Sequence, residues 1–225
     1  MTTPLTVTDS LIRMFDALMR AYPYVFHPAT TLGLGLLVLL YYEWRRQSAS
    51  RTALWRRLGV LLGSGSIAFS PTVVYMIVTG NGLRATTKGN VWQVDWLVGG
   101  GILLAMAALW TVWTRFGWGA LFSNGLEAVT AAMVPYLLLS PFWNVSGHVI
   151  IAVVPLLYLT LVDATFWPLL AIPVVMVPNR IYLDAHTWPQ ALGAFVLGAA
   201  LTLVVYRHRN GDGQDLTPER RFSGL

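Results

Sequence analysis

Seven long apolar segments constrain what this chain can fold into more than any other feature. They cover residues 28–43, 58–79, 96–113, 120–140, 148–164, 166–178 and 189–206. A helix of about 20 apolar residues is long enough to cross the hydrocarbon core of a membrane. Of the 225 residues, 56% are hydrophobic and 11% are charged, whereas a soluble domain carries about 25% charged residues. The sequence therefore predicts an all-α, polytopic transmembrane helix bundle of about six to seven spans.

The chain outside these segments is short. Residues 1–27 contain the stretch Ser10–Arg20, whose alternating polar and apolar residues predict an amphipathic helix lying in the membrane interface. Residues 28–206 are expected to form a single transmembrane domain. Residues 207–225, with their Gly/Asp-rich run, are expected to be a disordered cytoplasmic tail.

Arginines predict the orientation of the bundle. The first loop and the tail hold Arg45, Arg46, Arg51, Arg56, Arg57, Arg207, Arg209, Arg220 and Arg221. Because positively charged loops stay in the cytoplasm, these two regions are expected inside the cell membrane. The N-terminus and residues 80–95, 141–147 and 179–188 then face outward. The net charge of +5 does not indicate nucleic acid as a partner, since the arginines adjoin apolar segments, and membrane lipids are the expected surroundings.

Two short polar clusters stand at the ends of apolar segments. The first is Ser146-Gly147-His148, and the second is Asn179-Arg180 with His186 six residues after the arginine. Both are predicted on the same side of the membrane. Two imidazoles and a guanidinium are the groups that phosphoryl transfer through a histidine requires. The chain has no cysteine, and its histidines and carboxylates lack metal-ligand spacing, so neither a metal nor a cofactor is expected.

These clusters resemble two motifs of the phosphatidic acid phosphatase type 2/haloperoxidase superfamily, over residues of about 120–206. That family carries Pro-Ser-Gly-His, matched here by Val145-Ser146-Gly147-His148, and Ser-Arg, five residues, His, three residues, Asp. The resemblance implies that His186 is the nucleophile and His148 the general acid. It also implies that Arg180 and the backbone N–H groups of Ser146 and Gly147 bind the phosphoryl oxygens, as helix N-termini do for anions.

The chain departs from the family pattern at several positions. Gln190 stands where the family has the acid that orients the nucleophile, and Asn179 replaces the serine beside the arginine. The family's Lys, six residues, Arg-Pro motif is represented here by Met133, six residues, Ser140-Pro141, without either cation. Arg84 and Lys88, in a loop predicted to face outward, are candidates to replace the lost charges at the substrate phosphate.

The expected function is hydrolysis of a lipid phosphomonoester or diphosphate through a phosphohistidine intermediate at the outer membrane face. Two alternatives stay open on the sequence alone. One is a phosphotransferase that uses the same histidine chemistry with another acceptor. The other is a non-catalytic relative that binds lipid phosphate or acts as a scaffold, which the missing first motif and Gln190 favour.

Overall fold

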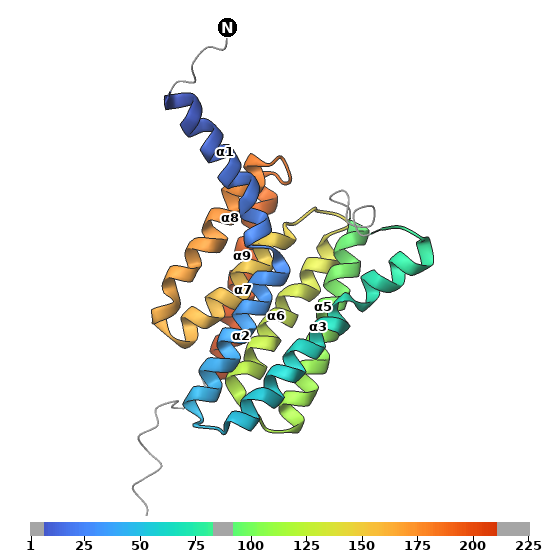
Figure 1. Cartoon of the computed structure of the whole chain (residues 1–225), viewed down its shortest axis with the longest axis vertical. Coiled ribbons are helices and arrows are strands. Elements are labelled where there is room, and N and C mark those ends of the chain that lie inside the picture. Colours follow the sequence, from blue (N-terminus) through green and yellow to red (C-terminus); the bar gives the residue numbers. More distant parts are fainter. Residues whose placement is uncertain (1–6, 83–91, 211–225) are drawn as a thin grey trace, which may run out of the picture.

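The computed structural model of the chain is an all-α bundle, and it describes residues 7–82 and 92–210 (Figure 1). No strand occurs within these two ranges. The elements are α1 (Val7–Val25), α2 (Pro28–Arg46), α3 (Arg51–Thr79), α5 (Trp92–Arg115), α6 (Ala120–Leu139), α7 (Gly147–Val162), the 3₁₀ helix η1 (Ala164–Leu170), α8 (Ala171–Tyr182) and α9 (Trp188–Asn210). All seven predicted apolar segments are helical, although 166–178 is divided between η1 and α8 and 148–164 runs past the end of α7. The predicted fold class is confirmed.

Five of the described helical stretches are long and apolar enough to cross a membrane. They are α3, α5, α6, the combined η1–α8 stretch Ala164–Tyr182, and α9. Helices α1 and α2 together meet the same criterion as a pair bent by 58°, which gives up to six spans. Helix α7 has 16 residues, or roughly 24 Å of helix, which is less than the thickness of the hydrocarbon core.

Helix α7 is the central element of the bundle, in contact with α2, α6, η1, α8 and α9. Its sequence from Val149 to Leu156 is apolar all round, and all of these residues are buried. A helix without a polar face is stable only where other helices cover every side of it. This explains why the short helix α7 lies at the centre while α3 lies at the edge, packed mainly on α5 (Figure 1).

Two glycines let neighbouring helices approach α7 closely. A Cβ atom on Gly35 of α2 would lie 2.7 Å from Pro155 Cβ, and one on Gly198 of α9 would lie 2.5 Å from Val153 Cγ1. Small residues at such crossings are typical of helix packing in membranes. These two glycines therefore allow α2 and α9 to pack closely on α7. Gly33 and Gly63 have no neighbour within 4 Å at the Cβ position.

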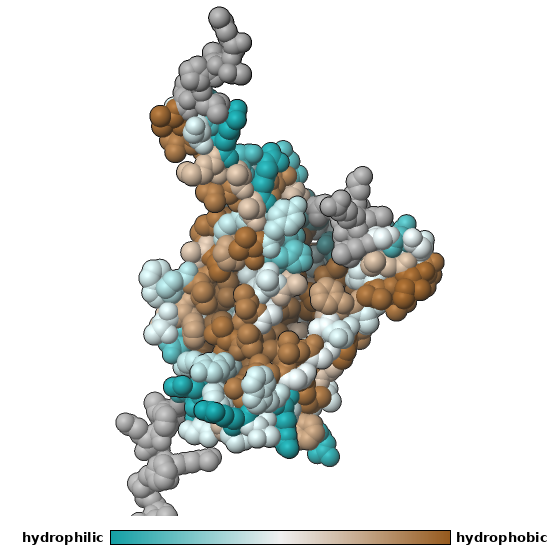
Figure 2. All heavy atoms as spheres, viewed as in Figure 1, coloured by the Kyte–Doolittle hydropathy of each residue, from teal (hydrophilic) through white to brown (hydrophobic). Residues whose placement is uncertain are grey.

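The two ends of the bundle differ in composition. We call the end that holds His27, His148 and His186 the histidine end, and the end where α2 and α9 finish and α3 begins the arginine-rich end. In Figure 2 apolar side chains gather across the middle of the visible face, with polar residues toward the arginine-rich end below. Helix α9 continues to Asn210, so the predicted tail boundary at residue 206 lies inside a helix.

Candidate active site

The turn after α8 brings His186 back to Arg180. Asp184 adopts a left-handed conformation with φ of 52°, which aspartate tolerates better than most residues. Its N–H group bonds to the Ile181 carbonyl, and the Ala185 N–H bonds to the Arg180 carbonyl, both at 3.0 Å. These two bonds form a Schellman motif. The His186 N–H donates to the same Arg180 carbonyl at 3.3 Å, so the arginine-to-histidine spacing is set by this helix end.

The imidazole of His186 is oriented by a backbone carbonyl. Its Nδ1 atom lies 3.0 Å from the oxygen of Asn144, in the loop that precedes α7. A carbonyl oxygen can only accept a hydrogen bond, so Nδ1 carries the proton in the neutral ring. The lone pair is then on Nε2, the atom that would attack a phosphorus. Trp143 holds this loop against α9, because its ring lies 2.4 Å from the Cβ position of Gly193.

His186 is neutral at neutral pH. The residue is 8% exposed, and burial, with a smaller effect of the nearby Arg180 charge, lowers the pKa of His186 to about 4. Both effects disfavour the imidazolium. The ring is therefore unprotonated on Nε2 over the pH range in which a nucleophile is needed.

His148 and its two preceding residues form the start of α7 on the same side. His148 interacts electrostatically with Arg180 and His186, and also with His27. Ser146 is the N-cap residue, yet its side chain makes no capping bond. The first N–H groups of α7 have no partner within their own helix and point toward this end. The structure therefore brings together His148, Arg180 and His186 at the end of the bundle where α7 begins.

Two polar atoms of this group are buried without a hydrogen bond. They are Ser146 Oγ and Arg180 Nε, and Ser146 is completely buried. A buried donor without a partner costs about 1–3 kcal/mol, and more if it is charged. Two such donors at one end of the bundle are typical of a site that a ligand completes, and a guanidinium with a hydroxyl suits an anion.

Gly147 has a second reason to be glycine. A Cβ atom at this position would lie 2.5 Å from the hydroxyl oxygen of Tyr136 on α6. Any side chain at 147 would therefore displace the tyrosine. The glycine permits close packing of α7 on α6 in addition to the predicted approach of a phosphate to its N–H group.

Gln190 lies elsewhere than the sequence suggested. Its Oε1 accepts the Thr187 N–H at 2.9 Å, which is the side-chain-to-backbone half of a capping box at the start of α9. The ring of His186 bonds to Asn144 instead. The main-chain carbonyl thus occupies the orienting position that the sequence assigned to Gln190, and it does so without a negative charge.

Asn179 connects the site to the N-terminal helix. Its side-chain Nδ2 donates to the carbonyl of Met19 on α1 at 2.6 Å, and the residue is completely buried. The Nδ2 bond fastens α1 to α8, while the Oδ1 atom of the same amide is buried without a hydrogen bond. Arg84 and Lys88, the candidate replacement cations, lie outside the described residues.

The positions of the family's first motif are apolar or paired. Met133 is 2% exposed in the core, and Ser140 donates its hydroxyl hydrogen to a carboxylate oxygen of Asp95 on α5. Neither residue supplies a positive charge. Within the described part of the chain, the phosphate of a substrate would meet Arg180 and the histidines.

Sequence reasoning missed Asn144 and His27. The Asn144 carbonyl is a main-chain group, so its role depends on how two loops meet and leaves no side-chain signal. His27 did have a signal, because a His-Pro pair at the start of an apolar segment predicts a helix start with the histidine as N-cap.

Comparison with known proteins adds no family assignment. The chain matches no family model, no curated protein and no solved structure.

Proposed function

We propose that this chain is a membrane lipid phosphatase that hydrolyses a lipid phosphomonoester or diphosphate through a phosphohistidine on His186. The observation that carries the proposal is the orientation of the His186 ring. Asn144 fixes its tautomer with the lone pair on Nε2, and the ring interacts electrostatically with Arg180, whose Nε is buried and unpaired. The resemblance of Ser146–His148 and Arg180–His186 to phosphatidic acid phosphatase motifs supports the same chemistry.

The proposed reaction has two steps. Nε2 of His186 attacks the terminal phosphorus, the bond from phosphorus to the leaving oxygen breaks, and the proton that a monoanionic phosphate brings passes through His148 to that oxygen. Arg180 and the first N–H groups of α7 bind the equatorial oxygens. Water then attacks the phosphohistidine, and one of its protons passes through His148 to the departing phosphate, which releases inorganic phosphate and restores both rings.

The proposed orientation places the site on the outer side of the cell membrane, with the C-terminus in the cytoplasm. The arginines at the opposite end of the bundle support it through the positive-inside rule. This part of the proposal is tested separately, by the accessibility of single cysteines introduced at each end of the natural cysteine-free chain.

The test of activity is phosphate release by the purified protein in detergent with EDTA, from a panel of lipid phosphates and diphosphates. The wild type is compared with His186→Ala and with the control His208→Ala, an exposed histidine at the arginine-rich end of α9. We expect release by the wild type and the control but not by His186→Ala. An alkaline quench with labelled substrate should trap phosphohistidine. Equal release by all three proteins would exclude His186 as the nucleophile.

A second candidate, binding of lipid phosphate without catalysis, is favoured by one observation. The first-motif positions Met133 and Ser140 supply no charge, because one is in the core and the other is bonded to Asp95. This candidate predicts Arg180-dependent binding of lipid phosphate with no release from any substrate. Release that appears only after an acceptor alcohol is added would instead indicate a phosphotransferase.

A further inference from the structure

His27 brings a third imidazole to the histidine end from outside the part of the chain that carries the motifs. It lies between α1 and α2, where Pro28 starts the new helix. A residue before proline avoids the helical conformation, and His27 is extended, with φ of −61° and ψ of 147°. The ring centroids of His27 and His148 are 5.7 Å apart and the rings are perpendicular. The break between the two helices therefore presents His27 to the proposed general acid.

The cap bond fixes which nitrogen of His27 is a donor. Nδ1 accepts the Ala29 N–H at 3.2 Å, so this atom carries no proton. In the neutral ring the proton is then on Nε2, the nitrogen on the far side from the cap bond. His27 can thus cap α2 and donate a hydrogen bond from Nε2 at the same time.

The three residues differ in exposure. His186 is buried, His148 is partly buried and His27 is exposed. If the terminal phosphoryl group meets His186 and Arg180, the leaving oxygen meets His148. The next group of the substrate, on the side toward the lipid tail, is then the one that reaches His27.

We propose that His27 is a specificity-determining residue that selects lipid diphosphates, an inference that rests on the proposed function. In a diphosphate the group after the leaving oxygen is a second phosphate, whose oxygens accept the Nε2–H of His27. In a monoester it is a carbon, which has no acceptor. A hydrogen bond to a charged group at this position therefore discriminates between the two substrates.

The chemistry of the leaving group points the same way. His186 is oriented by a neutral carbonyl, which stabilises a developing imidazolium less than a carboxylate does. A phosphate leaving group, whose second pKa is about 6, departs far more easily than an alkoxide. Attack by Nε2 on the terminal phosphorus breaks its bond to the bridging oxygen, and His148 protonates that oxygen. Water then cleaves the phosphohistidine, so one diphosphate and one water give a lipid monophosphate and inorganic phosphate.

The experiment compares farnesyl diphosphate with farnesyl monophosphate, which share one tail. The variants are His27→Asn, which keeps a side-chain cap for α2, and His27→Ala, which removes it; His208→Ala is the control. We expect both His27 variants to lower the ratio of kcat/KM for the diphosphate over the monophosphate by about tenfold, chiefly through KM, as expected for one lost hydrogen bond to a charged group. His27→Asn should keep the wild-type Tm, whereas a residue that only caps α2 would lower Tm in His27→Ala and leave the ratio unchanged in both.

Binding separates this inference from the proposed function. The same two lipids are titrated into His186→Ala and into His186→Ala with His27→Asn, neither of which turns over. A loss of affinity of about tenfold that is confined to the diphosphate supports the role of His27 even if the wild type releases no phosphate. An equal loss for both lipids, or none, overturns it even if the wild type is an active phosphatase.

Discussion

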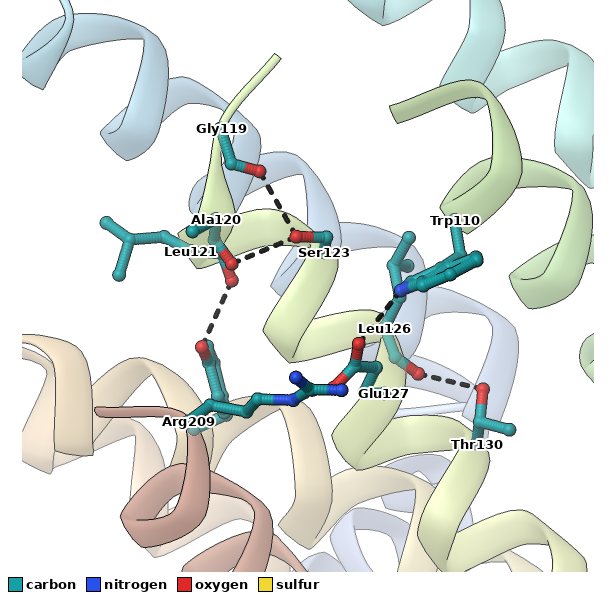
Figure 3. Close-up of polar contacts among 10 residues, drawn as sticks. Trp110, Gly119, Ala120, Leu121, Ser123, Leu126, Glu127, Thr130 and Arg209 are labelled. Atoms are coloured by element: carbon teal, nitrogen blue, oxygen red, sulfur yellow. Dashed lines mark hydrogen bonds and ion pairs between the residues drawn. The ribbon is translucent and has the colours of Figure 1, made fainter. Parts of the chain in front are cut away.

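Polar side chains at the two ends of the bundle differ in how completely they are hydrogen-bonded. At the arginine-rich end, the carboxylate of Glu127 receives a bond from Trp110 Nε1 at 2.9 Å and another from Arg209 Nε at 2.6 Å (Figure 3). Glu43 there accepts from Trp113 and from the Leu121 N–H. At the histidine end, Ser146 Oγ and Arg180 Nε are buried without partners.

The difference indicates which polar groups serve the fold. A carboxylate in a bundle is costly unless it is bonded, and the buried Glu43 and the partly exposed Glu127 are bonded on both oxygens. The groups around Arg180 are left incomplete, which destabilises the free protein but leaves donors for a ligand. Unpaired nitrogens also occur at the arginine-rich end, on Asn210 and Arg57, but Arg57 bonds to Gln47 and lies over the rings of Trp113 and Trp118.

Removing Glu43 should give the largest effect on stability. Glu43→Ala deletes the carboxylate that faces the buried Arg57 and that caps the start of α6 through Leu121. A buried charge left without its partner costs about 3–5 kcal/mol. Thermal unfolding in detergent measures the loss, and Glu43→Gln, which keeps one acceptor oxygen, is the matched control. An unchanged Tm in Glu43→Ala would show that the bonded carboxylate at the arginine-rich end does not stabilise the fold, which contradicts the proposed difference between the two ends.

Acid should destabilise the histidine end through His186. The pKa of His186 is lowered from 6.5 to about 4 by burial and by Arg180, so the unfolded chain binds more protons between these two pH values. The free energy of unfolding therefore falls as the pH drops from about 6.5 to about 4, by about 3 kcal/mol over the whole window. The measurement is unfolding against pH in the wild type and in His186→Gln, which keeps a donor for Asn144. The variant should lack this part of the slope, and identical slopes would contradict the buried neutral ring.

Arg180→Lys should weaken ligand binding without weakening the fold. Lysine keeps the positive charge but loses the planar fork that binds two phosphoryl oxygens. Loss of a charge-assisted hydrogen bond is expected to reduce the affinity for farnesyl monophosphate by about 1.5–3 kcal/mol. Arg209→Lys, at the other end, is the control for binding. If Arg180→Lys lowers the Tm but leaves the affinity intact, the arginine is structural.

The smallest expected effect is that of Gln190→Ala. Removing the side chain that bonds to the Thr187 N–H should lower stability by about 1 kcal/mol, the typical contribution of a helix cap. Phosphate release per folded molecule should not change, because the Asn144 carbonyl orients His186. Gln190→Glu keeps the capping box and should match the wild type in Tm. If Gln190→Ala loses more activity than it loses folded protein, Gln190 has a direct role in the candidate active site.

Several features of the site could be predicted from local sequence. The pairing of Arg180 with His186 follows from a helix end whose turn closes through Asp184, and such turns depend on a few consecutive residues. The position of Ser146-Gly147-His148 at a helix start is equally local. Both clusters lie at one end because two helical passes separate them. The chain leaves the first cluster through α7 and returns to the same end through η1 and α8.

The sequence by itself determined the helices, their apolar lengths and the two polar clusters, because hydropathy and capping act over a few neighbouring residues. Only the tertiary structure decided that the Asn144 carbonyl orients His186 and that His27 faces His148 across 121 residues of chain. Those contacts depend on how α7 packs among α2, α6, α8 and α9. A main-chain carbonyl carries no residue identity, and a distant histidine has no periodicity to reveal its neighbour, so packing alone could assign both.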